Sequence, residues 1–190
     1  MSYYEVLLFL HIFAVIVWVG GGIALLYLSA WGEQTRNAAF MQGLGASSEW
    51  LTRRLFIPAS LATLVLGVLL TIEGPWSFDI LWIDLGFVGF AVSFLIGILF
   101  LKPEGARIGR AIAAHGPESS EARHHIHRIG VVEKVEFVIL VLVVAAMAIK
   151  PTSEDTGTLI LFAAVTAAAV ALGVRSLRTG RGQPRAQPAD

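Results

Sequence analysis

His11 is the residue whose type and position point most directly to chemistry. It is the only histidine inside a long apolar stretch, and it lies seven residues beyond Tyr4, roughly 10 Å along a helix. An ionisable side chain in hydrocarbon is a functional hypothesis by default. Three interpretations are open: a hydrogen bond that tightens a helix bundle, a ligand to haem or a metal ion, and a role in proton transfer.

The face of a helix that carries His11 offers room for a flat cofactor. Trp18 and Gly22 follow His11 at steps of 7 and 11 residues, which places them on one side of a helix. The run from Gly20 to Gly22 lets either a neighbouring helix or a planar group approach the backbone. His11, Trp18 and Gly22 are therefore candidate cofactor-binding residues, and haem b is one candidate cofactor.

A divalent metal ion is the other candidate ligand of His11. Glu73 and Asp84 are expected at a similar depth near the ends of the next two apolar stretches, and imidazole with carboxylates suits a hard or borderline cation. The chain has no cysteine and three methionines, which disfavours copper(I). Asp84 has a second interpretation, as a solvated residue or a partner of a helix dipole.

Two polar clusters lie toward the opposite ends of the apolar stretches. Glu133, Lys134 and Glu136 interrupt a later stretch, and we expect either a structural ion-pair network or part of a cation or proton path. The expected partners are basic residues of neighbouring loops: Arg53, Arg54 or Lys102.

A histidine cluster precedes that later stretch. Its members are His124, His125 and His127, with Glu121 one turn before His125. Spacing alone permits a metal site, but the nearby Arg123 and Arg128 would repel a cation. We expect contact with anionic lipid headgroups instead.

Composition requires that most of the surface meets lipid. Hydrophobic residues make up 56% of the 190 residues and charged residues 15%, and the mean hydropathy is +0.73. These values leave too few polar side chains to cover a water-soluble fold. The formal net charge of zero gives no indication of a nucleic-acid partner, and no nucleotide loop, nucleophile triad or zinc-protease motif is present.

Apolar stretches long enough to cross a bilayer predict an all-α membrane protein, a bundle of four core transmembrane helices plus a fifth C-terminal helix. The expected spans are residues 4–28, 55–72, 80–101, 129–149 and 158–174. The first is expected to be retained rather than cleaved. Serines near residue 119 predict that the fourth helix begins well before its apolar part. We expect one domain over residues 1–178 and a disordered, basic Gly/Pro-rich tail over 179–190.

The distribution of positive charge predicts the orientation. Thirteen of the fourteen Lys and Arg residues fall on one side of the expected spans, and Lys150 alone falls on the other. The positive-inside rule then places the N-terminus outside and the tail in the cytoplasm. The alanine-rich fifth helix favours close packing within the bundle, in a homo-oligomer or against a larger membrane complex.

The segment Leu10-His-Ile-Phe-Ala-Val-Ile-Val-Trp-Val-Gly-Gly-Gly resembles the first span of a group of bacterial membrane proteins. The group includes the copper-resistance D family, HemJ-type protoporphyrinogen oxidases and a related family of predicted membrane proteins without assigned function. Residues 129–149 also resemble the last core span of the HemJ-like proteins. The resemblance implies a four-helix core in the bacterial inner membrane and a role for His11 in haem or metal binding.

The chain departs from the HemJ-like pattern at one informative position. Those proteins carry a lysine near the start of the third span, where this chain has Asp84. The resemblance is therefore closest to the unassigned family. The leading hypothesis is a membrane protein that binds haem or a metal ion through His11, in redox or metal handling. The alternative is a non-catalytic accessory subunit that docks through its fifth helix and tail.

Overall fold

Helices account for nearly all of the backbone in the computed structural model, which describes residues 2–35 and 37–179. The first long helix combines α1 (Tyr3–Val15), a π-helical segment η1 (Ile16–Gly20) and α2 (Gly21–Gln34). The second combines α3 (Ala38–Leu51), η2 (Thr52–Phe56) and α4 (Ile57–Glu73), and the third combines α5 (Leu81–Ile96), η3 (Gly97–Leu101) and α6 (Lys102–His115). They are followed by α7 (Ser120–Ile149) and α8 (Thr156–Thr179). The described residues contain no strand.

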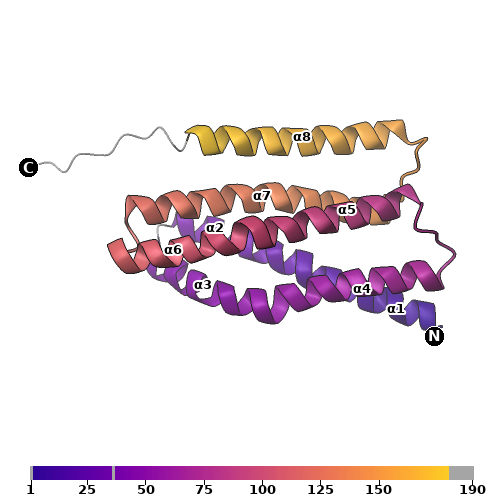
Figure 1. Ribbon diagram of the computed structural model, residues 1–190, viewed down its shortest axis with the longest axis horizontal. Helices are drawn as coiled ribbons and strands as arrows, with labels where there is room; N and C mark the ends of the chain where they lie inside the picture. The colour runs from indigo at the N-terminus through magenta and orange to yellow at the C-terminus, as the bar shows by residue number, and fades with distance from the viewer. Residues whose placement is uncertain (1, 36, 180–190) are drawn as a thin grey trace, which may run out of the picture.

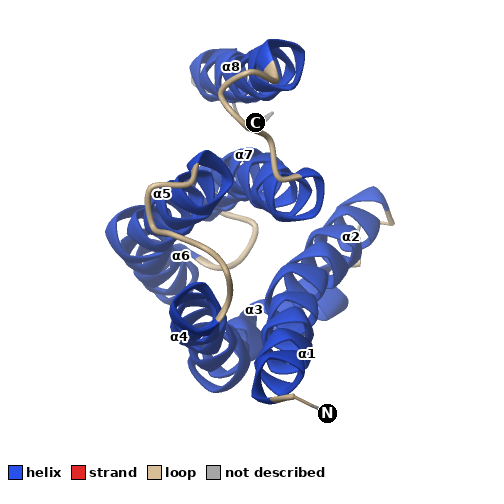
Figure 2. Cartoon of the chain, turned by 90° about the vertical axis from the view of Figure 1, so that its right-hand side faces the viewer, coloured by secondary structure: helices blue, strands red, loops and turns tan. Residues whose placement is uncertain are grey.

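The chain passes back and forth along one axis (Figure 1). In the end view, the three composite helices and α7 form a ring of four, and α8 lies outside that ring against α7 (Figure 2). This arrangement confirms the expected four-helix core with an added C-terminal helix. The expectation for the tail concerns residues 179–190, of which the described part contains Thr179 alone, at the end of α8.

Side-chain caps fix the starts of three helices. Ser2 and Glu5 form a reciprocal capping box at α1. Asn37 accepts a hydrogen bond from the backbone of Phe40 at α3, and Ser119 accepts one from Ala122 at α7. The last contact confirms that the fourth helix begins before its apolar part.

The second and third helices are longer than the predicted spans. Residues 38–54 and 102–115, expected as loops, continue the helices. Pro58 and Pro103 each follow a π-helical segment by two residues. Proline cannot donate to the preceding turn and clashes with its carbonyl, and the wider π turn accommodates that gap without ending the helix.

Length and composition identify four segments able to cross a membrane: Tyr3–Gly32, Ala39–Glu73, Leu81–His115 and Thr156–Thr179. The 30-residue α7 falls outside this set because Glu133, Lys134 and Glu136 interrupt its apolar stretch. At 1.5 Å per residue, a 35-residue helix is about 52 Å long, whereas the hydrocarbon core is about 30 Å thick. The composite helices therefore extend well beyond the bilayer core.

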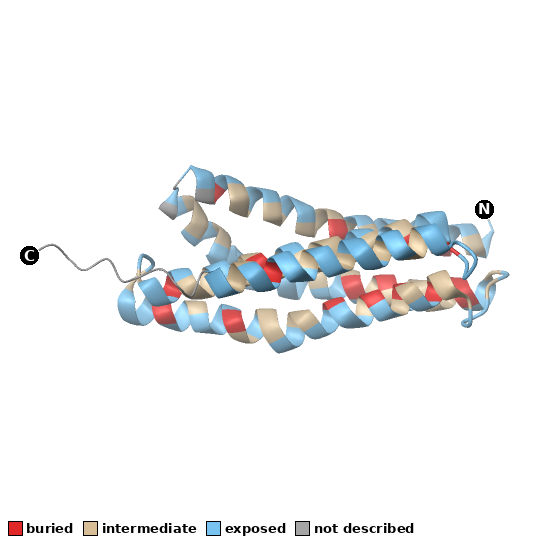
Figure 3. Cartoon of the chain, turned by 90° about the horizontal axis from the view of Figure 1, so that it is seen from above, coloured by how far each residue is buried: buried red, intermediate tan, exposed pale blue. Residues whose placement is uncertain are grey.

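Buried residues are few and are scattered along the helices (Figure 3). Large apolar side chains are exposed on the outside of the helices, and on α8 Ile160, Leu161 and Leu172 are each more than half exposed. Gly173 is the one buried residue of α8. Such surfaces suit contact with lipid.

Candidate functional site

The imidazole of His11 reaches from α1 to the facing helix α4. Its Nδ1 lies 3.0 Å from the backbone oxygen of Thr63. Because a carbonyl oxygen only accepts hydrogen bonds, Nδ1 carries the proton and donates it. The Thr63 hydroxyl donates to the Ala59 oxygen at 2.9 Å and does not compete for the imidazole. The lone pair of the neutral ring therefore resides on Nε2.

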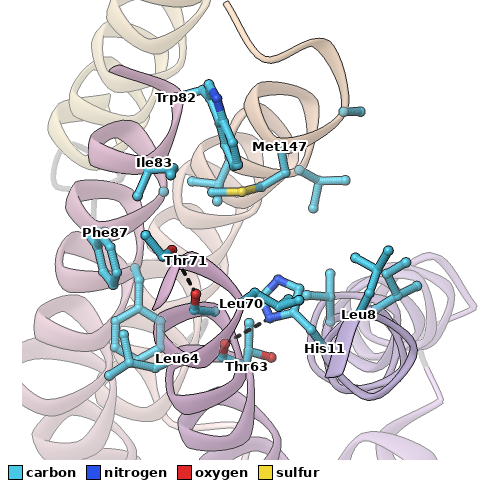
Figure 4. Close-up of a pocket in the computed structure, with 18 of the residues that line it drawn as sticks. Leu8, His11, Thr63, Leu64, Leu70, Thr71, Trp82, Ile83, Phe87 and Met147 are labelled. Carbon is cyan, nitrogen blue, oxygen red and sulfur yellow. Dashed lines mark hydrogen bonds between the residues drawn. The ribbon is translucent and has the colours of Figure 1, made fainter. Parts of the chain in front are cut away.

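Gly67 allows this close approach of α1 to α4. A Cβ atom at residue 67 would lie 3.3 Å from His11 Cε1, tighter than most Cβ contacts in proteins. The imidazole thus packs directly against the backbone of α4, beside the carbonyl of Thr63 (Figure 4). Local packing and one hydrogen bond together fix the ring.

His11 lines a cavity of about 480 Å³ between α1, η1, α4, α5 and α7. The walls are almost entirely apolar and aromatic (Figure 4). The lining includes Tyr4 and Leu8 of α1, so the cavity lies in the half of the bundle where α1 begins. Walls contributed by the facing helices include Leu64, Leu70, Ile83, Phe87 and Met147. A volume of this size falls in the range of small-molecule and cofactor sites.

His11 Nε2 is open to this space. Nε2 makes no hydrogen bond with the described part of the chain. Every buried side-chain nitrogen of the described residues has a hydrogen-bond partner, so an Nε2 atom without a partner is not buried. The accessible space beside the ring is the cavity. The Thr71 hydroxyl, which also lines the cavity, donates to the Gly67 oxygen at 2.9 Å. His11 Nε2 accordingly offers the cavity an imidazole lone pair that no described residue uses.

The mouth of the cavity is built from aromatic rings and one cation. Trp76 and Trp82 meet edge to face at 5.1 Å, and Trp76 Nε1 donates to the Tyr4 hydroxyl at 3.3 Å. Lys150 Nζ lies 4.4 Å from the centre of the Trp76 ring. Lys150 has φ +55°, the left-handed region that most residues avoid. The end of α7 thus holds an ammonium group over the rim.

Of the predicted cofactor-binding residues, the structure brings His11 and Trp18 together at the cavity. Trp18 also contacts Phe90 edge to face at 5.5 Å. Gly22 does not line the cavity, and the space around its backbone is open. The π turn at Ile16–Gly20 explains the difference, because it shifts the angular register of every residue that follows it.

The predicted metal ligands do not converge. Glu73 and Asp84 are exposed, at the end of α4 and in the first turn of α5, and neither lines the cavity. Over residues 2–35 and 37–179, no group of three or more His, Asp or Glu side chains is placed to hold a metal ion. The position of Asp84 matches its second interpretation, as a partner of the helix dipole.

The opposite end of the bundle contains a cluster that the sequence did not indicate. The Glu104 side chain is fully buried and accepts from His125 at 2.8 Å. The same carboxylate pairs with Arg128 at 3.0 Å and with Arg107. This carboxylate therefore has three donors, of which His125 and Arg128 tie α6 to α7 and Arg107 belongs to α6 itself.

Glu136 of α7 makes a different contact from the one expected. Glu136 accepts a hydrogen bond from the Ser93 hydroxyl at 2.5 Å, and Arg53 pairs with Glu49. Among the ion pairs of the described residues, none joins Glu136 or Lys134 to the basic residues named above.

Four residues that line the His11 cavity were not predicted from the sequence: Thr63, Gly67, Met147 and Lys150. Thr63 acts through its backbone oxygen, which leaves no signature in the side-chain sequence. Lys150, used only in the charge count, carried a usable signal, because a cation beside tryptophans can contact their rings.

Comparison with known proteins is consistent with this architecture. The family described as "Predicted integral membrane protein (DUF2269)" matches residues 5–151, which include α1 to α7 and exclude α8. No curated protein matches the chain, and no solved structure matches it. Because the match covers most of the chain, this protein belongs to the DUF2269 family of predicted integral membrane proteins.

Proposed function

We propose that this membrane protein binds haem b in the cavity beside His11, with Nε2 as the one axial ligand from the chain. The observation that carries the proposal is the open Nε2 atom of an imidazole whose Nδ1 donates to the Thr63 oxygen. Histidines that bind metals nearly always donate their other N–H to a carbonyl or carboxylate, which orients the ring and raises its basicity.

The donor set favours haem over a bare divalent ion. A porphyrin supplies four nitrogen ligands itself, so its iron needs only an axial side chain from the protein. A bare ion needs several protein donors, and none of the described His, Asp and Glu residues form such a group. Apolar walls and the rings of Trp18 and Phe87 suit the faces of a macrocycle.

Lys150 would face the polar edge of the ligand. Haem carries carboxylates on one edge, and an ammonium at the mouth of an apolar cavity provides a matching charge. When bound, haem supplies one-electron redox chemistry, and a site near the membrane surface suits exchange of electrons with a partner. The resemblance of the first helix to copper-resistance D and HemJ-type proteins supports the same role.

The test is an absorption spectrum, with parallel metal analysis, of detergent-purified protein produced with a haem supply. We expect a Soret band that is lost in His11→Ala and kept in His115→Ala, a change to an exposed histidine outside the cavity. Imidazole added to His11→Gly is expected to restore the band. Val15→Trp, which fills the cavity and keeps His11, is expected to lower haem content.

Two results would contradict the proposal. A colourless wild-type protein, despite a haem supply, would leave His11 as a packing residue. About one divalent ion per chain without a Soret band, lost in His11→Ala, would favour the metal-ion alternative.

The accessory-subunit alternative is supported by α8. This helix packs mainly against α7 and exposes long apolar side chains, so it has surface for another membrane protein or a second copy. Deletion after Lys150 is expected to release the protein from such a complex without removing the cavity. Retention in the complex after this deletion would exclude docking through α8 and the tail.

The proposed orientation places the cavity at the outer face of the bacterial inner membrane and the Glu104 cluster at the cytoplasmic face. Its support is the excess of Lys and Arg around α6, the start of α7 and the end of α8. A reporter that is active only in the cytoplasm, fused after Thr179, is expected to be active. An inactive but stable fusion would reverse the orientation.

A further inference from the structure

A second cavity, of about 340 Å³, lies between α7 and α8, away from the His11 site. It is a groove that opens along the outside of the ring. Ten residues line it: His127, Gly130, Val131, Lys134, Val135, Val138, Ala169, Leu172, Gly173 and Ser176. The α7 members recur every three or four residues, so they form one continuous face of that helix.

The floor of the groove is apolar and shaped by two glycines. Gly173 marks the close approach of the helices, because a Cβ there would lie 2.8 Å from Val135 Cγ2. At Gly130 a Cβ would meet nothing within 4 Å, so the groove is open at that point. With Val131 and Val138 it forms a trough of the kind that holds a hydrocarbon chain.

The polar residues of the groove lie toward the start of α7. Lys134 is exposed and forms no ion pair with a described residue. His127 lies two turns nearer the helix start, with Nε2 3.4 Å from the Ser176 oxygen. Side chains on a helix lean toward its N-terminus, so the Lys134 ammonium extends toward the level of His127.

The two basic groups lie on either side of a boundary between hydrocarbon and headgroups. From Ile149, Lys134 lies about 22 Å and His127 about 33 Å along α7, and the hydrocarbon core is about 30 Å thick. With Ile149 at one boundary of the core, the apolar floor lies within it and His127 lies just beyond the opposite boundary. The Lys134 backbone lies about 8 Å inside that boundary, and its long side chain extends toward the headgroups.

We propose that the α7–α8 groove binds an anionic phospholipid, with one acyl chain on the floor and the phosphate at Lys134 and His127. Charge complementarity selects this occupant, since the Lys134 ammonium is not matched by a carboxylate lining the groove. The site does not depend on the proposed haem site. The α7 wall of the groove lies within the residues that match the family, and the α8 wall lies outside them.

The test measures the thermal stability of the full chain in detergent with added lipid. Dioleoyl phosphatidylglycerol is expected to raise the melting temperature, whereas dioleoyl phosphatidylcholine and inorganic phosphate are not. Lys134→Gln is expected to weaken phosphatidylglycerol binding about fivefold, as for one basic side chain at an anionic membrane surface. Lys134→Arg is expected to keep it. Lys102→Gln, at an exposed lysine outside the groove, is the matched control.

A second variant tests the acyl-chain trough separately from the charge. Gly130→Leu places a side chain in open space and is expected to fill the floor, so that native mass spectrometry shows loss of retained phosphatidylglycerol. Equal weakening by Lys134→Gln and Lys102→Gln would overturn the proposal in favour of general surface attraction. Stabilisation by inorganic phosphate alone, or unchanged lipid retention in Gly130→Leu, would also overturn it.

Discussion

The two ends of the four-helix ring differ in how their helices are held together. At the end where α1 begins, glycines bring helices together around a cavity, and the polar atoms are few. At the other end, Glu104 is buried beneath Arg107, His125 and Arg128. The first end contains a cavity and an imidazole nitrogen without a hydrogen bond, and the interior of the second end is occupied by paired charged side chains.

This difference follows from the solvent that each end meets. Within lipid, burial of apolar side chains gives little driving force, so helices associate through close backbone packing and a few polar contacts. Beyond the hydrocarbon core, water and headgroups permit dense ion pairing. The cavity end therefore has the space for the proposed haem, and the charged cluster ties helices together.

The largest expected effect on the free energy of unfolding comes from removing the Glu104 carboxylate. Glu104→Ala leaves two arginines and a histidine facing one another without their carboxylate. Breaking a buried ion pair on one side costs about 3–5 kcal/mol, and we expect the lower end because Arg107 and Arg128 are partly solvated. The measurement is the free energy of unfolding in detergent. The exposed Glu49, changed to Gln, is the control, with about 0.5 kcal/mol expected for a surface pair.

A smaller effect tests the glycine packing of the cavity end. A Cβ at residue 89 would collide with a γ-methyl of Val143, a branched side chain with little freedom to move. Gly89→Ala is expected to destabilise by about 1–3 kcal/mol through overpacking. Gly105→Ala, where a Cβ meets nothing, is expected to stabilise α6 by about 0.5–1 kcal/mol. Unfolding curves with the same sign for both variants would contradict this account.

The smallest effect concerns the connection before α8. The Thr152 amide and hydroxyl donate to the Asp155 carboxylate at 2.8 and 2.9 Å, which lowers the pKa of Asp155. A lowered pKa contributes stability at neutral pH that is lost as the pH falls through the folded value. Acidification is therefore expected to speed hydrogen exchange in the first turn of α8. Asp155→Asn is expected to show the fast exchange at neutral pH, and a pH response retained in that variant would assign it to another group.

Sequence reasoning recovered the number of helices and their order, because long apolar stretches have few alternatives in a membrane. It underestimated their lengths where polar residues and prolines interrupt the pattern. The expected spans began at residue 55 and ended at residue 101, yet a π turn before Pro58 and before Pro103 lets each helix continue. A hydropathy pattern does not show whether the backbone hydrogen bonds of a turn span four residues, as in an α-helix, or five, as in a π turn.

The candidate site was predicted in part. His11 and Trp18 were identified because a single imidazole in hydrocarbon and a helical step are visible in the sequence. Gly22 was assigned to the face of His11 from ideal α-helical geometry. The π turn at Ile16–Gly20 changes the angular position of the residues that follow it, so this assignment does not hold. Glu104 was missed because its three partners come from two helices whose contact the linear pattern does not encode.

α8 determines whether the chain passes along the bundle an even or an odd number of times. Residues 5–151, which match the family, make four passes along the bundle and return the backbone to the end where α1 begins. The fifth pass, through α8, carries the backbone to the other end (Figure 1). Each pass that crosses a bilayer changes the compartment that the chain occupies. Because α8 is long and apolar enough to cross a membrane, such a crossing would put Thr179 in the compartment opposite that of Pro151.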